Sequence, residues 1–126
     1  MAVAVDRALA EQLRDAATED EWKDTVIDYA TLRGWLVHHD RPARTNKGYR
    51  TAIQGNAGFP DLVLTRFGEP VLFVELKSAT GALRPEQIVW RDTLIAAGAE
   101  WRLWRPSDWD EVAATLDNRG PRSSLR

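Results

Sequence analysis

The segment from Asp61 to Lys77, DLVLTRFGEPVLFVELK, places the strongest limit on the fold. Two apolar runs flank the polar stretch RFGEP, a pattern that predicts two antiparallel strands joined by a turn. Asp61 and Glu75 each lie seven positions from Gly68, so a turn centred on this glycine sets the two carboxylates opposite each other. Opposed residues share a face of the sheet, with Cβ atoms about 4.5–5.5 Å apart. Lys77 shares that face because side chains alternate along a strand.

This arrangement gathers two negative groups and one positive group at the open end of a hairpin. Opposed like charges destabilise a strand pair unless something offsets their repulsion, and a divalent cation would do so. Two carboxylates with several waters suit Mg²⁺, which can activate water and stabilise charge on a phosphate. The lysine would then orient that water or neutralise the phosphate. The alternative is structural, with Asp61 and Lys77 forming an ordinary surface ion pair.

Helical and strand patterns on both sides of the hairpin predict an α/β fold. Thr18 and Glu21 form a capping-box pattern that begins a helix, and Ser107 is placed to cap the last helix. Residues 41–60 read as a long loop. The expected helices span 3–17, 19–33, 85–97 and 108–116, and the strands outside the hairpin span 35–39 and 99–104.

The composition excludes several classes of protein. The absence of cysteine excludes disulfides, cysteine zinc sites and thiol nucleophiles. No apolar run is long enough to span a membrane, and the N-terminus lacks a signal-peptide pattern, so we expect a cytoplasmic protein with no membrane partner. A net charge of -2 argues against a protein that coats nucleic acid through bulk charge, but it is compatible with a local basic patch.

Three segments together resemble the VRR-NUC domain, the virus-type replication-repair nuclease branch of the PD-(D/E)xK superfamily. They are GFPDLVL, then VELK with its glutamate fourteen residues after Asp61, then LRPEQIVWRDTLIAAGAEWRLWRP. The resemblance covers most of the chain, from the helix that begins at Thr18 to the last helix. It implies a restriction-endonuclease-like α-β-β-β-α-β core, with a mixed sheet flanked by helices, and cleavage of DNA phosphodiester bonds with Mg²⁺ or Mn²⁺.

The resemblance also implies roles for individual residues. Pro60 and Asp61 match the PD motif, and Glu75, Leu76 and Lys77 match ExK. Asp61, Glu75 and the backbone carbonyl of Leu76 would hold the metal. Lys77 would position or polarise the attacking water.

The family uses a further glutamate on its first helix, for which the chain offers Glu19 and Glu21. Glu19 precedes Trp22 by three residues and Val26 by seven, so it projects toward the core side. Glu21 already has a role in the capping box, and we therefore favour Glu19 as the catalytic, metal-binding glutamate. Gln87 matches the family's glutamine after ExK. It would reach the catalytic lysine or a phosphate, or it is simply a polar residue at a helix start.

A basic loop points to a nucleic-acid partner. Arg41, Arg44, Lys47 and Arg50 lie in the segment 41–60, which contains no acidic residue. Basic side chains supply phosphate contacts, and Arg84, after the sequence SATGAL, would serve in the same way. The alternative is a solvated loop whose charges bind nothing.

We therefore predict a metal-dependent DNA endonuclease, bacterial or phage-encoded, that acts in replication, repair or recombination. The chain has no separate sequence-reading module, so we expect it to recognise branched, flap or junction DNA by structure, and to act as a homodimer. The rival is a non-catalytic nucleic-acid-binding or assembly module on a nuclease fold. The expected division is a helical extension over 1–17, a VRR-NUC-like nuclease domain over 18–117 and a flexible basic tail over 118–126.

Overall fold

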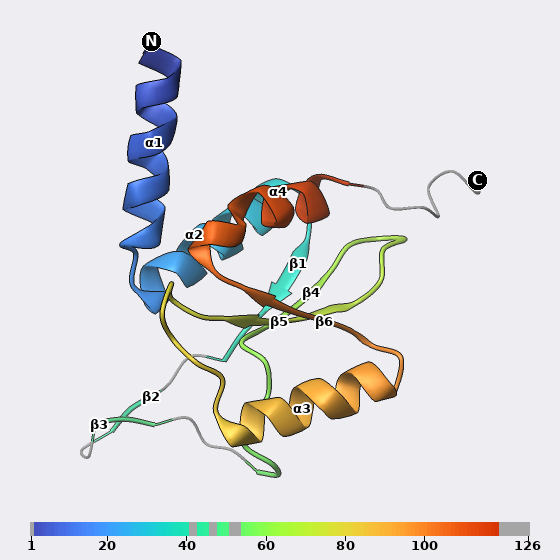
Figure 1. Cartoon of the computed structure of the whole chain (residues 1–126). Coiled ribbons are helices and arrows are strands. Elements are labelled where there is room, and N and C mark those ends of the chain that lie inside the picture. The colour runs from blue at the N-terminus through green and yellow to red at the C-terminus, as the bar shows by residue number, and fades with distance from the viewer. Residues whose placement is uncertain (1, 41–42, 46–47, 51–53, 119–126) are drawn as a thin grey trace.

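A four-stranded mixed sheet lies at the centre of the computed structural model (Figure 1). The strand order is β1-β4-β5-β6, in which β1, β4 and β5 pair antiparallel and β6 joins β5 in parallel. The strands are β1 Leu36–His38, β4 Leu62–Thr65, β5 Leu72–Leu76 and β6 Glu100–Trp104. The structure describes the backbone of residues 2–40, 43–45, 48–50 and 54–118, and the side chains of residues 7–13, 15–40 and 54–118.

Helices cover the two faces of the sheet. α2 and α4 lie on one face, α3 lies on the other, and α1 projects away from the layered body (Figure 1). The helices are α1 Ala2–Asp15, α2 Glu19–Leu32, α3 Pro85–Ala96 and α4 Trp109–Asp117, the last preceded by the 3₁₀ helix η1 Pro106–Asp108. The mixed α/β architecture expected from the sequence is confirmed.

The apolar core lies on the side of the sheet that carries α2 and α4. Alternate residues of β4 and β5 enter it, and residues of α2 enter it at helical spacing. Trp22 and Trp35 are buried there, and their indole N–H groups donate to the carbonyl oxygens of Trp104 and Leu116, at 3.0 and 2.9 Å. These bonds satisfy polar atoms that burial would otherwise leave unpaired. The buried apolar residues are Trp22, Val26, Ala30, Trp35, Leu62, Leu64, Leu72, Val74, Leu76, Trp104, Val112 and Leu116.

The hairpin register agrees with the sequence arithmetic. Leu62 lies opposite Val74, and Leu64 lies opposite Leu72, so the pairing is symmetric about position 68. Gly68 has a φ of 82°, a left-handed conformation that glycine adopts without a steric penalty. The predicted β-hairpin is therefore confirmed.

Helix α2 begins as its sequence predicts. The Thr18 side chain accepts a hydrogen bond from the Glu21 N–H, and the Glu21 carboxylate accepts one from the Thr18 N–H. The helix ends before Gly34, which has a φ of 87°. Local capping chemistry thus fixes where the helix begins and ends.

Two expectations at the element level are wrong. Residues 41–60 are not a continuous loop, because β2 Ala43–Thr45 and β3 Gly48–Arg50 pair as a small antiparallel sheet. Strands of three residues are too short to show a clear alternating pattern. Ser107 does not cap the last helix, because it lies inside η1, where the Asp108 carboxylate accepts the Arg105 N–H at 2.8 Å. The expected flexible tail falls almost entirely outside the described residues.

The sequence predicts no segment that spans a membrane. Among the residues that the structure describes, no helix combines the length and the apolar character needed to cross a bilayer.

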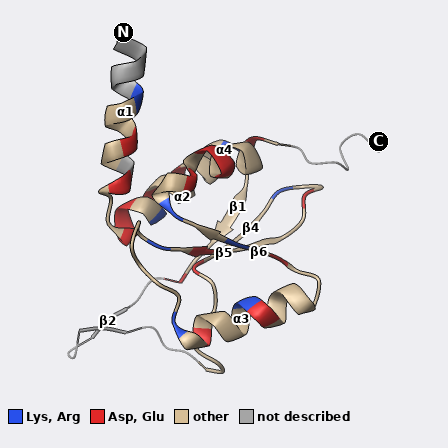
Figure 2. Cartoon of the chain, in the orientation of Figure 1, with Lys and Arg blue, Asp and Glu red and all other residues tan. Residues whose placement is uncertain are grey.

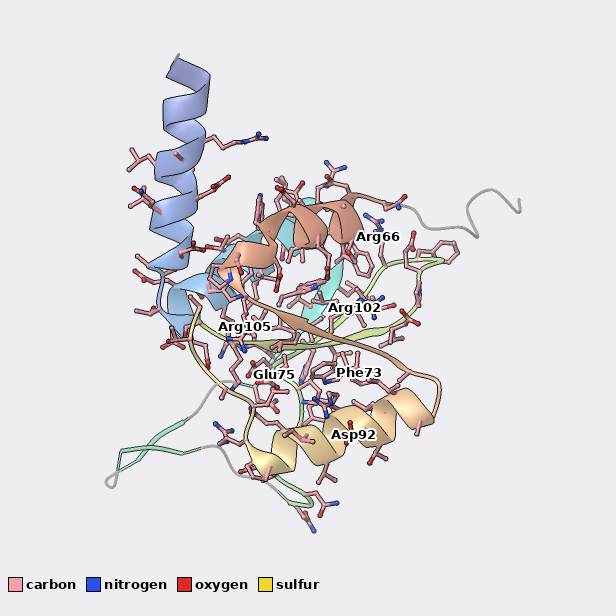
Figure 3. The ribbon with its side chains drawn as sticks, viewed as in Figure 1. Arg66, Phe73, Glu75, Asp92, Arg102 and Arg105 are labelled. Atoms are coloured by element: carbon pink, nitrogen blue, oxygen red, sulfur yellow. The ribbon has the colours of Figure 1, made fainter. Side chains whose placement is uncertain are left out.

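A buried arginine ties the hairpin turn to the C-terminal helix. Arg66 is only 8% exposed, and Figure 3 shows it beside the end of α4. Its guanidinium donates to the carbonyl oxygens of Arg33, Leu116 and Asn118 at 2.9, 3.0 and 2.6 Å. It also lies 4.7 Å from the ring centroid of Trp35. A single side chain therefore joins three chain segments at one edge of the core.

We expect Arg66→Gln to lower the free energy of unfolding by about 2–3 kcal/mol, because charged donors to three carbonyl groups are lost. Urea denaturation followed by circular dichroism measures the change. Arg91→Gln is the matched control, since within the described part of the chain Arg91 pairs with its exposed neighbour Asp92 alone, and it should change stability by less than about 0.5 kcal/mol. Equal effects of the two substitutions would show that the Arg66 bonds contribute nothing specific.

Candidate active site

Three buried polar side chains gather on the side of the sheet that faces α3. Glu75, Lys77 and Gln87 are 2%, 5% and 5% exposed. Figure 3 shows Glu75 between the sheet and α3, with Phe73 on the same side. Burying charged groups is costly unless they are paired, so the partners of these side chains define what the site can do.

The carboxyl groups of Asp61 and Glu75 face each other at the open end of the hairpin. Asp61, half-buried just before β4, accepts the N–H of Leu76 at 2.8 Å. The Glu75 carboxyl group lies on the same face, since Leu62 pairs with Val74 and the next pair outward is Asp61 with Glu75. The ammonium of Lys77 lies 3.8 Å from a Glu75 oxygen. The surface ion pair considered as an alternative for Asp61 and Lys77 is not what the structure shows, because Lys77 is buried and pairs with Glu75.

Gln87 holds Glu75 from the first turn of α3. Its side-chain N–H donates to a Glu75 oxygen at 2.9 Å, and its carbonyl oxygen accepts the backbone N–H of Arg84 at 2.8 Å. The bond from Arg84 fixes the orientation of the amide, so that the amide nitrogen points at Glu75. The sequence left two roles open for Gln87, contact with the lysine or a phosphate and a polar position at a helix start; the structure places its amide nitrogen on the Glu75 carboxylate and its oxygen at the helix start.

Burial and like charge make Glu75 a weak acid. Its pKa is raised from 4.5 to about 8, chiefly by desolvation and then by the facing charge of Asp61. Lys77 lowers the pKa in part, and Glu19 adds a smaller increase. Without a metal, Glu75 is therefore largely protonated at neutral pH. If both carboxyl groups ionise, their negative charge exceeds the single positive charge of Lys77, and a bound cation would offset the difference.

The two candidate glutamates of α2 have different surroundings. Glu21 is exposed and bonded within the capping box. Glu19 is half-buried, and its charge acts on Glu75. Figure 2 shows the acidic first turn of α2 that contains both. However, within the described residues, no group of three or more His, Asp or Glu side chains is arranged to hold a metal ion. Glu19 therefore lies near the Asp61–Glu75 pair without forming a three-carboxylate cluster with it.

The backbone leading into Asp61 is packed against α3. Gly58 has a φ of 99°, and a Cβ at this position would lie 2.5 Å from the carbonyl oxygen of Glu86. The indole N–H of Trp90 donates to the carbonyl oxygens of Ala57 and Asn56, at 3.1 and 3.3 Å. Only glycine allows this approach. This contact was not predicted from the sequence, although the glycines of GNAGFP before the PD motif indicate a close approach of the backbone.

A cleft of about 610 Å³ opens beside Asp61 and Gln87. Lys23 reaches it from α2, one helical turn after Glu19, and Arg84 reaches it from the start of α3. The sequence alone does not place Lys23 in this cleft, because the position of its side chain depends on how α2 packs against the sheet. The other lining residues are Asp40, Gln54, Gly55, Asn56, Ala57, Gly58, Phe59, Pro60 and Trp90.

The structure locates only some of the expected DNA-binding residues. Arg84 lines the cleft and lies 3.5 Å from Glu86 in an exposed ion pair. Arg44 and Arg50 lie on β2 and β3, but their side chains are outside the described part of the chain. Arg41 and Lys47 are outside the described residues altogether.

We expect the metal-free protein to lose stability as the pH rises from about 4.5 to about 8. Over this range the folded state keeps a proton on Glu75 that the unfolded chain releases, so a higher pH favours unfolding. Urea denaturation in EDTA at several pH values measures the slope. Glu75→Gln imitates the protonated form and should flatten the slope. Asp20→Asn, on the exposed side of α2, should retain it. A wild-type slope in the Glu75→Gln variant would contradict the assignment.

The comparisons with known proteins agree with this geometry. The family profile of the VRR-NUC domain matches residues 39–106, which is more than half of the chain. The match includes Asp61, Glu75, Lys77 and Gln87, and it leaves Glu19 outside. No curated protein and no solved structure matches the chain. The resemblance inferred from the motifs is confirmed, and the chain belongs to the VRR-NUC domain family.

Proposed function

We propose that this VRR-NUC domain is a metal-dependent DNA endonuclease that cleaves phosphodiester bonds in branched DNA. One observation carries the proposal: Asp61 and Glu75 face each other across the hairpin, with Lys77 beside them. The pair is buried beside a cleft that is open to a substrate. A purely structural role gives no reason to oppose two acids at this position, since opposed like charges destabilise a strand pair.

The donor groups fit Mg²⁺ or Mn²⁺. Asp61 and Glu75 supply two carboxylates, and Mg²⁺ usually takes one or two while keeping several waters. The N–H and C=O of one residue point to the same side of an extended strand. Since the Leu76 N–H points at Asp61, the Leu76 carbonyl points to that side as well and adds a third oxygen. Glu19 would act through its charge or through a water.

A metal bound there would lower the pKa of a coordinated water and offset charge on the phosphate. The residues of the chain have supporting roles. Lys77 holds a positive charge next to Glu75, where it would orient the attacking water or neutralise a phosphate oxygen. Gln87 fixes the Glu75 carboxylate through one donated hydrogen bond. Burial on the sheet strengthens each of these electrostatic interactions.

The cleft supplies a path for a nucleic-acid strand. Lys23 and Arg84 place positive charge on two elements that border Asp61, and basic groups contribute phosphate contacts. The small β2–β3 sheet carries Arg44 and Arg50 and projects beyond the body of the protein (Figure 1). Such a projecting basic segment suits a branched DNA better than a short recognition sequence. This feature supports the structure-directed part of the proposal.

A homodimer is part of the same proposal. It follows from the general preference of soluble oligomers for symmetric dimers. The rival function is a non-catalytic nucleic-acid-binding or assembly module. The complete set of Asp61, Glu75 and Lys77 favours catalysis, since a module without catalysis has no need of all three.

We expect Asp61→Asn, Glu75→Gln and Lys77→Ala each to reduce DNA cleavage by roughly 10³-fold or more, as when members of a catalytic unit are removed singly. Purified variants are assayed on flaps, splayed arms and four-way junctions with Mg²⁺, with Mn²⁺ and with EDTA. Asp92→Asn is the control, because Asp92 is exposed on α3 and pairs with Arg91. If the wild type binds these DNAs tightly but cuts none with either metal, the non-catalytic module is the better description.

We expect Lys23→Gln and Arg84→Gln to weaken DNA binding and to flatten its dependence on salt. Each lost phosphate contact should lower the slope of log K against log salt by about 0.9 on duplex DNA. Fluorescence anisotropy with inactive Glu75→Gln protein, titrated at several salt concentrations, measures the slope without cleavage. Arg91→Gln retains the wild-type slope if the effect belongs to the cleft. An unchanged slope in both cleft variants would place the DNA elsewhere.

A further inference from the structure

The turn that follows the ExK motif covers Lys77. The backbone N–H of Gly81 donates to the side-chain oxygen of Ser78 at 3.1 Å and so closes the segment 78–81, called here the 78–81 turn. A Cβ added at Gly81 would lie 3.5 Å from Cδ and 3.7 Å from Cβ of Lys77. The turn therefore lies directly on the lysine methylene groups and helps to keep the side chain 5% exposed.

Arg105 holds this turn from the end of β6. One guanidinium nitrogen donates to the carbonyl oxygens of Ser78 and Gly81, at 2.8 and 2.6 Å. These two carbonyls are the two ends of the turn. Figure 3 labels Arg105, which directly follows β6, the strand paired with the one that carries Glu75. Both bonds come from a charged donor, and such bonds are roughly twice as strong as neutral ones.

The backbone of Arg105 is held in place as well as its guanidinium group. The preceding residue, Trp104, is fully buried and accepts the backbone N–H of Lys77 at 3.2 Å. The N–H of Arg105 itself donates to the Asp108 carboxylate at 2.8 Å. Arg105 therefore connects the rigid end of the sheet to the turn over Lys77.

We propose that Arg105 is a positioning residue for Lys77. It acts through the 78–81 turn, which confines a long flexible side chain to the rotamer that places its ammonium group beside Glu75. The proposal rests on the proposed nuclease function for its kinetic consequence alone. Its structural half, that Arg105 keeps Lys77 covered, stands on the contacts of the turn.

The lysine content of the chain allows a direct test. The sequence has three lysines, Lys23, Lys47 and Lys77, so reductive methylation followed by peptide mass spectrometry reports on each. In the wild type, Lys77 should react far more slowly than Lys23. In Arg105→Gln, Lys77 should react faster than in the wild type, because local opening of the turn exposes it, while Lys23 reacts at its wild-type rate. Unchanged protection of Lys77 would overturn the proposal.

Two further variants separate this role from general destabilisation. Arg102→Gln is the matched control, because Arg102 lies on β6 and, among the described residues, bonds to Glu100 and the Trp101 carbonyl and not to the 78–81 turn. It should leave Lys77 protected. Ser78→Ala opens the turn without altering β6, and it should expose Lys77 in the same direction as Arg105→Gln. If Arg105→Gln does not fold, Ser78→Ala decides, and continued protection in that variant counts against the proposal.

Cleavage kinetics supply the readout that a merely structural role would not move. Arg105→Gln should lower kcat about 10–100-fold, the range seen when a group that orients a site residue is removed, and leave KM near its wild-type value. Faster labelling with an unchanged kcat would overturn the positioning role. If the wild type cuts no DNA, the proposed function fails, and the positioning role fails with it. The labelling experiment would still report whether Arg105 holds the turn.

Discussion

The opposition of Asp61 and Glu75 across the β4–β5 hairpin is the constraint on which the rest of the site depends. Two acids at one buried point are unstable unless a proton or a cation stands between them. The chain surrounds them with the Leu76 N–H, the Gln87 amide and the Lys77 ammonium. These donors do not remove the free-energy cost of ionising both acids, since the pKa of Glu75 stays at about 8. A divalent metal would offset that remaining cost.

The sequence predicted the parts of this site that depend on local geometry. The distance of Asp61 and Glu75 from Gly68 sets their register, because side chains alternate strictly along both strands. The capping box and helical phase favoured Glu19 over Glu21, and the charge of Glu19 acts on Glu75. In each case, the relation between residues follows from the repeat of one element or of one hairpin. No information about distant contacts was needed.

The missed residues all depend on how separate elements pack. Lys23 lines the cleft from α2, and Arg105 reaches the 78–81 turn from the segment that follows β6. Gly58 needed the position of α3 to reveal its close backbone contact. The contact between Gln87 and Glu75 was not predicted for the same reason. Helical phase indicated the side on which it lies, but only the packing of α3 decided that its amide meets Glu75 and not Lys77.

The two faces of the sheet have different roles, one in stability and the other in the chemistry of the site. The face under α2 and α4 holds the apolar core, whereas Glu75, Lys77 and Gln87 are buried on the side of α3. Within α3, only Gln87 is buried. A helix that contributes so little to the apolar core is best explained by what else it holds: the amide on Glu75 and the Trp90 bonds to the loop before Asp61. Substitutions on the α2–α4 face should therefore act mainly through folding, and those at the inner contacts of α3 mainly through the geometry of the carboxylate pair.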